Sequence, residues 1–159
     1  MTKILALIVS MLLTFFPDSA FLESQAQQLA YPGDETVCRE VAKAIISNDI
    51  EAIANMYCEA DKNNSERNLT EQIQNLICAI EGTIIKAEKS HGLGSQSDRS
   101  DYGVYKSHRD FVLDIFTTET TYRLYIFWVT VDTEFPENVG MGSMLLIDTN
   151  TKSKVAEAF

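Results

Sequence analysis

Three cysteines, at positions 38, 58 and 78, are the side chains of this sequence with the clearest capacity for chemistry. In an oxidising compartment two of them can form a disulfide, which leaves one thiol to pair with another chain or to be buried. All three pairings are open, and we favour Cys58 with Cys78 because Cys38 and Cys58 fall far apart in the first helical segment. The cysteines and the two histidines lack the close spacing of structural zinc ligands, so no metal is expected.

Acid–base chemistry has one weak candidate. An isomerase-like site needs a carboxylate in an apolar pocket with a tyrosine facing it. Asp114 with Tyr125 or Tyr105 is the nearest combination, although an acid within a strand usually faces solvent. Residues 108–110 (His-Arg-Asp) resemble a kinase catalytic loop without its glycine-rich loop, and residues 140–143 lack the G-x-S-x-G elbow. We therefore expect no catalytic residues and no cofactor.

The segment 121–133 carries apolar side chains on both sides of an expected strand. A strand covered by helices on one face only would alternate with polar residues, so its second face also needs a cover. The cover could be ordinary core packing in a curled sheet, a dimer partner or an apolar ligand. The aromatic side chains of this strand are our candidate binding residues: Trp128, Tyr125 and Phe127. By alternation, Leu124, Ile126 and Trp128 share one face, and Tyr125, Phe127, Val129 and Val131 share the other.

The elements that position these residues follow from periodicity. Helical spacing predicts helices over 35–47 and 50–58 that meet at a bend, followed by an exposed loop over 59–67. Asn68 and Glu71 form a capping pair for a third helix, whose apolar face extends to Ile84 and which stops at Gly92. Residues 92–101, rich in glycine and serine, are expected to be a mobile connection.

After residue 101 the apolar period changes from 3.6 to 2. Alternation and β-branched content predict strands over 102–116, 121–133, 139–147 and 155–159. Four consecutive strands after helices indicate an α+β domain, with the N-terminal helices packed on a curved four-stranded antiparallel sheet.

The N-terminus has the layout of a secretory signal peptide: Lys3, an apolar run over 4–16, and small side chains at Ser24 and Ala26 before a cut. The apolar run is shorter than the ~20 residues of a membrane-spanning helix. The sequence therefore predicts a signal peptide over 1–26, a single domain over 27–159, and a periplasmic or secreted protein without a stable membrane span after cleavage.

The charge balance limits the partners. The formal net charge is −10, with a pI near 4.6. A negative field repels phosphate backbones, so nucleic acid is not an expected partner. The same field attracts a basic protein, although net charge also serves the solubility of an exported protein.

The stretch AKAIISNDIEAIANMYCEAD, two helical faces around an Asn-Asp break, resembles the opening of the nuclear transport factor two-like, or cystatin-like, superfamily. Helices followed by a curved antiparallel sheet extend the resemblance over most of residues 35–159. The resemblance implies a cone-shaped fold with a pocket that some members use as a ligand or isomerase site and others as a binding or dimerisation surface. This sequence lacks a clear strand between the second and third helices, so no pocket residue is carried over.

Three functions remain open. The leading one is an exported, non-enzymatic binding protein, such as an inhibitor or immunity protein, whose partner is another, basic protein or a second copy of itself. The second is a small-ligand carrier or enzyme with an apolar pocket between helices and sheet. The third is an accessory protein of an envelope assembly.

Overall fold

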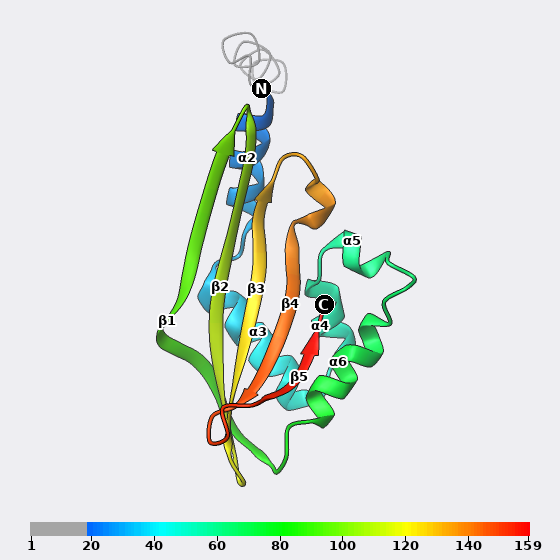
Figure 1. Ribbon diagram of the computed structural model, residues 1–159, viewed down its shortest axis with the longest axis vertical. Helices are drawn as coiled ribbons and strands as arrows, with labels where there is room; N and C mark the ends of the chain where they lie inside the picture. The colour runs from blue at the N-terminus through cyan, green and yellow to red at the C-terminus, as the bar shows by residue number, and fades with distance from the viewer. Residues whose placement is uncertain (1–18) are drawn as a thin grey trace, which may run out of the picture.

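The computed structural model describes residues 19–159 and places helices before an antiparallel sheet (Figure 1). The predicted signal peptide lies outside these residues over 1–18, and its last part, 19–26, lies within the first described helix. The helices are α2 (Ser19–Ala30), α3 (Asp34–Ser47), α4 (Ile50–Met56), α5 (Glu59–Lys62) and α6 (Leu69–Cys78). The strands are β1 (Ile84–Asp101), β2 (Val104–Thr117), β3 (Thr121–Asp132), β4 (Gly140–Asp148) and β5 (Lys154–Ala158), with a 3₁₀ turn, η1 (Pro136–Asn138), before β4.

The sheet is an open antiparallel meander. Its strand order is β1-β2-β3-β4-β5, so each strand pairs with its neighbours in the chain, and β1 and β5 are the two edges. In Figure 1 the helices lie behind and beside the sheet: α2 contacts β2 and β3, α3 contacts β1 and β2, and α6 contacts β5. The α+β class is thus confirmed, but the sheet is an open sheet of five strands and not the curved four-stranded sheet that the sequence predicts.

The additional strand is β1, which replaces the second half of the predicted third helix. Helix α6 ends at Cys78, and Gly82 turns the chain with φ +82. Glu81 N donates to Tyr122 Oη at 3.1 Å, which anchors this turn to β3. Ile80 and Ile84 still pack against the core, but from the turn and the strand. Their helical spacing was therefore a misleading signal.

Residues 92–101 are likewise a strand and not the predicted mobile connection. They form the distal half of β1 and pair with β2 up to Asp101 opposite Val104. A bulge between Lys89 and Gly94 separates the two halves of the strand. Gly94 has φ +138, and a Cβ there would lie 2.6 Å from Asp110 O, so only glycine fits this close approach. The polar composition reflects a hairpin exposed to solvent.

The helix boundaries before α6 agree with the sequence. Asn48, with φ +53, ends α3, and Asp49 caps α4 by accepting a hydrogen bond from Ala52 N at 2.9 Å. This is the predicted bend. The predicted loop over 59–67 contains the short helix α5.

The predicted cap of the next helix is present, since Asn68 Oδ1 accepts a hydrogen bond from Glu71 N at 3.3 Å and its amide donates to Glu71 Oε2 at 2.8 Å. Asn68→Ala should therefore lower the free energy of unfolding by about 1 kcal/mol, measured by urea denaturation. Asn55→Ala is the control, because Asn55 is an exposed residue inside α4 where alanine is the better helix former. Equal stability of the Asn68→Ala variant and the wild type would contradict a capping role.

The core lies between the helices and the inner face of the sheet, the face toward the helices. It is closely filled: the central side chains of α4, α6, β3 and β4 are 0% exposed. These include Ile53, Ile73, Leu76, Leu124, Met144 and Leu146. Among residues 19–159, no helix is long and apolar enough to cross a membrane.

Candidate functional site

The strand register separates the aromatic residues of β3 onto two faces. Leu124 pairs with Leu113 on β2 and Leu146 on β4, and this row belongs to the core. The next row, Val112, Tyr125 and Leu145, therefore projects from the opposite face. We call this opposite face, which points toward the viewer in Figure 1, the outer face. Its apolar side chains are Val112, Phe116, Tyr125, Phe127, Val129, Leu145 and Ile147.

No helix among residues 19–159 covers the outer face, and its aromatic side chains are partly open to solvent. Tyr125 is 38% exposed. The ring of Phe127 lies 5.1 Å from the ring of His108 and so close to Gly142 that a Cβ there would be 3.0 Å from Phe127 Cδ1. Phe127 is thus held in place by its neighbours while its side chain remains partly exposed. A fixed, partly exposed aromatic cluster is a typical anchor for a protein partner.

Charged residues surround this cluster, and most are already paired. Arg123 Nε donates to Asp114 Oδ1 at 3.0 Å, and Lys86 pairs with Glu88 at 2.6 Å. Asp110, opposite Phe127, accepts a hydrogen bond from Ser95 Oγ at 2.6 Å but forms no ion pair with any described residue. Asp110 is therefore a carboxylate beside the aromatic cluster that a cation on a partner can meet.

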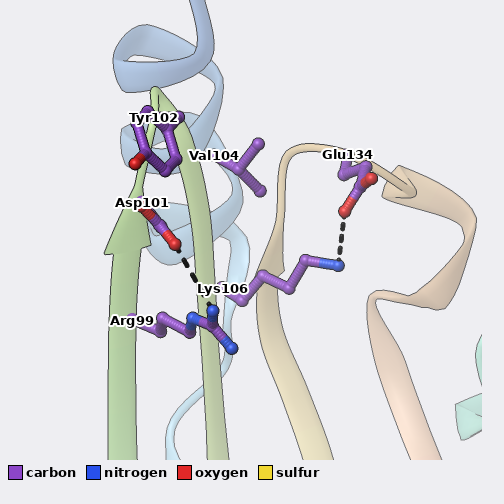
Figure 2. A pocket seen from close by; sticks show the side chains of 6 residues that line it. All are labelled: Arg99, Asp101, Tyr102, Val104, Lys106 and Glu134. Carbon is purple, nitrogen blue, oxygen red and sulfur yellow. Dashed lines mark hydrogen bonds and ion pairs between the residues drawn. The ribbon is translucent and has the colours of Figure 1, made fainter.

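A hollow of about 320 Å³ lies at the distal end of the β1–β2 hairpin (Figure 2). Across this hollow, Lys106 forms an ion pair with Glu134 at 2.7 Å, and Arg99 forms one with Asp101 at 3.4 Å. Tyr102 at the turn of the hairpin is fully exposed. Because each cation here has its own carboxylate, the hollow offers no unpaired charge that would single out a ligand.

Trp128 lies on the inner face, apart from Tyr125 and Phe127. It pairs with Arg109 on β2 and Met141 on β4, packs against the core, and its ring is 5.9 Å from the ring of Tyr31. It also borders an open recess of about 250 Å³ beside the helices. The three candidate binding residues are thus divided between two surfaces, as their alternation along β3 implies.

One part of the predicted alternation is wrong. Thr130 is an extra residue in β3, because Val129 pairs with His108 and Val131 with the adjacent Ser107. Thr130 Oγ1 lies 3.0 Å from Ser107 Oγ, which fixes this bulge. The bulge turns Val131 to the inner face, beside Ser107 and α2, instead of the predicted side of Tyr125.

The weak acid–base candidate is brought together only in part: Tyr125 shares the outer face with Asp114 and lies two residues along β3 from Arg123, the ion-pair partner of Asp114. Asp114 lies on the outer face in an ion pair with Arg123, whereas Tyr105 packs against Phe21 of α2, with ring centroids 6.1 Å apart. A carboxylate that is paired with a guanidinium at the surface lacks the apolar pocket that such a base requires. Among the described residues, no group of histidines, cysteines and carboxylates could hold a metal ion.

The predicted Cys58–Cys78 disulfide is not formed, and all three cysteines are free. Cys58 is buried before α5, with its Sγ 3.1 Å from Asp61 Oδ2, whereas Cys78 is exposed at the end of α6. Cys58 precedes α5 and Cys78 ends α6, and chain spacing alone could not reveal where their side chains point.

The thiols should differ sharply in reactivity. Burial is the main cause that raises the pKa of the Cys38 thiol to about 11, and burial also raises the pKa of Cys58. At pH 8 only about one in a thousand Cys38 thiols is then ionised. We expect iodoacetamide to modify one cysteine of the native protein, Cys78, and all three in denaturant, as counted by intact mass. Rapid modification of all three in the native protein would contradict the burial.

Comparison with known proteins identifies a family, but the description of that family assigns no activity. The sequence matches, over residues 40–149, the model of a family described as a domain of unknown function (DUF5104). The match extends from α3 to β4 and includes the outer face, while α2 and β5 lie outside it. No curated protein matches the sequence.

Proposed function

We propose a function for a chain that belongs to the DUF5104 family: it is an exported, non-enzymatic protein that binds another, basic protein through the outer face of its sheet. The observation that supports the proposal is the Tyr125–Phe127 cluster, a set of partly exposed aromatic side chains that no described helix covers. A contiguous apolar patch at a protein surface marks a contact surface.

The charges favour a basic partner over a second copy. The chain carries a formal net charge of −10, so two copies repel each other as they approach. Asp110, which forms no ion pair with a described residue, adds a negative charge next to Phe127. A partner with an apolar contact and a lysine or arginine beside it would match both features. An inhibitor or immunity protein for a basic enzyme, secreted or periplasmic, is a function of this kind.

The test starts from the exported proteins of the host. A protein that is retained by the immobilised chain is identified, produced separately and recombined with it, and the affinity is measured by calorimetry. We expect the chain and the identified partner to form a saturable complex whose affinity falls about tenfold between low and high salt. A complex insensitive to salt, or no saturable complex, would argue against it.

The charge of Asp110 can be tested in the same assay. Asp110→Asn keeps the shape of the side chain and its contact with Ser95 but removes the charge. We expect a slower association rate and a weaker salt dependence. Asp101→Asn is the matched control, because Asp101 lies at the hairpin end and is already paired with Arg99. Equal effects of the two substitutions would place the charged contact elsewhere.

A small-ligand carrier is the second candidate, supported by the recess beside Trp128. Tyr31, Tyr57 and Met56 line this recess of about 250 Å³ with the indole. Native mass spectrometry of the protein from its host would detect a bound molecule as a few hundred additional daltons that are lost on activation. An unliganded mass would leave the outer face as the binding site.

A further inference from the structure

Strand β1 has a free edge over its distal half. It is the first strand in the order of the sheet, and no described strand pairs with its side away from β2 (Figure 1). Helix α3 packs on the proximal half, where Lys89 Nζ lies 3.1 Å from Glu35 Oε1. Beyond the bulge, every residue from Gly94 to Asp101 is exposed. Among the described residues, the distal half therefore has β2 as its one strand partner.

The backbone of β2 shows which groups of β1 point outward. Tyr105 N donates to Thr133 Oγ1 at 2.9 Å, and Tyr105 O accepts from Thr133 N at 3.0 Å, so both groups point toward the β3 side. Ser100 lies opposite Tyr105, and inward and outward residues alternate along an antiparallel pair. The register stays regular back to Gly94. The residues whose N–H and C=O point away from β2 are therefore Gly94, Gln96, Asp98 and Ser100.

The other edge of the sheet, β5, is short and already covered. Its Ala158 O accepts a hydrogen bond from Tyr57 Oη at 3.0 Å, and α6 packs beside it. Natural sheets protect an edge with proline, a bulge, a short strand or charge. Residues 94–101 contain no proline and no bulge, so charge is their remaining protection, and a partner of opposite charge removes it. A row of open backbone groups accepts an extended chain segment.

Two carboxylates flank these open groups, one on each face of the sheet. Asp98, opposite Ser107 on the inner face, accepts hydrogen bonds from Ser107 Oγ and Gln96 Nε2 but forms no ion pair with a described residue. The Ser107 hydrogen bond lowers the pKa of the Asp98 carboxyl, which is therefore ionised at neutral pH. On the outer face, Asp110 Oδ2 lies 2.6 Å from Ser95 Oγ, so this carboxylate leans toward β1. On an added strand, a cation beside Ser95 and a cation three residues away would lie on opposite faces and meet one carboxylate each.

We propose that the basic partner contributes an extended segment that pairs with the distal half of β1 and adds a strand to the sheet, with lysine or arginine side chains three positions apart on opposite faces. This inference rests on the proposed function and names how the partner binds: it contacts the outer face and continues over the adjoining edge. Backbone hydrogen bonds supply affinity, and the two cations fix the register. A second copy fits less well, because two chains of net charge −10 repel each other.

A peptide assay tests the edge without the partner protein. The probe is acetyl-TVKTVKVT-amide, a good strand former with lysines three positions apart. The reference is acetyl-TVKVKTVT-amide, which has the same composition but carries both lysines on one face. Each peptide is titrated into the isotope-labelled full chain and followed by NMR. We expect the probe to bind about tenfold more tightly than the reference and to slow hydrogen exchange at the outward amides of Gln96, Asp98 and Ser100.

Gln96→Pro blocks the edge without removing a hydrogen bond to β2, because the N–H of Gln96 points outward. It should lower the affinity for the probe by about tenfold or more. Gln96→Ala is the matched control: it also loses the side-chain contact with Asp98 but keeps the N–H, and it should bind as the wild type does. Asp98→Asn should reduce the affinity for the probe to that for the reference peptide.

Equal binding of the two peptides, or a folded Gln96→Pro variant that binds the probe normally, would overturn the proposal. Absence of probe binding, or protection confined to another part of the chain, would overturn it as well. If Gln96→Pro does not fold, Ser100→Pro provides the comparison at another outward residue. A doubled mass of the chain alone that Gln96→Pro abolishes would assign the edge to a second copy instead. Because the assay contains no partner protein, its failure is distinct from failure of the proposed function, which is measured with the recombined partner.

Discussion

Replacing Tyr125 and Phe127 together by alanine is expected to weaken the complex with the partner protein roughly 100-fold or more, since aromatic anchors at the centre of an interface typically contribute about 2 kcal/mol each. Both side chains point away from the core, and Tyr125 is 38% exposed, so the variant should still fold. The affinity is measured by calorimetry with the recombined partner, and the fold by circular dichroism.

Tyr102→Ala is the control for this pair. Tyr102 is a fully exposed aromatic residue at the hairpin turn, so its loss removes the same kind of side chain outside the outer face. The control should bind as tightly as the wild type. A Tyr125/Phe127 variant that is folded and binds normally would remove the outer face from consideration.

Trp128→Ala is expected to affect stability and not partner binding. It should lower the free energy of unfolding by about 3 kcal/mol, as other large-to-small core substitutions do. The indole packs on the core and on Tyr31, and its removal leaves a cavity between β3 and the segment that joins α2 to α3. Urea denaturation measures the loss. Binding through the outer face should be retained at temperatures where the variant is folded.

Trp128→Phe distinguishes packing from a specific role of the indole. A phenyl ring fills part of the same space, so the loss of stability should be smaller than for alanine. Normal stability of Trp128→Ala with complete loss of partner binding would mean that Trp128, and not the Tyr125–Phe127 cluster, is the contact residue.

The sequence predicted those elements whose local signals agree with their final packing. The break at Asn48 and Asp49 and the cap at Asn68 are visible because they depend on side chains that bond to their own backbone. The strands β2 to β5 are visible because their period of two is regular over most of their length. These features require no knowledge of distant contacts.

The parts that were missed depend on contacts between distant segments. Strand β1 is polar in its distal half, so only its pairing with β2 makes it a strand. The bulge at Thr130 follows from its contact with Ser107 and reverses the face of Val131. The candidate site was partly predictable, because alternation already separates Trp128 from Tyr125 and Phe127. Asp110 as an available charge could be found only from the geometry of its neighbours.

The order of the strands also bears on how the molecule assembles. Because every strand pairs with its neighbours in the chain, most of the sheet can form hairpin by hairpin, and such local topologies fold quickly. The closing contacts are different: Tyr57 Oη donates to Ala158 O at 3.0 Å, and Phe159 N donates to Gln72 Oε1 at 3.0 Å. Both join the first half of the chain to its last residues. The sheet and its contacts with α2 and α3 can therefore begin to form early, whereas the contacts that join Tyr57 and α6 to the last strand wait until residues 158 and 159 are in place.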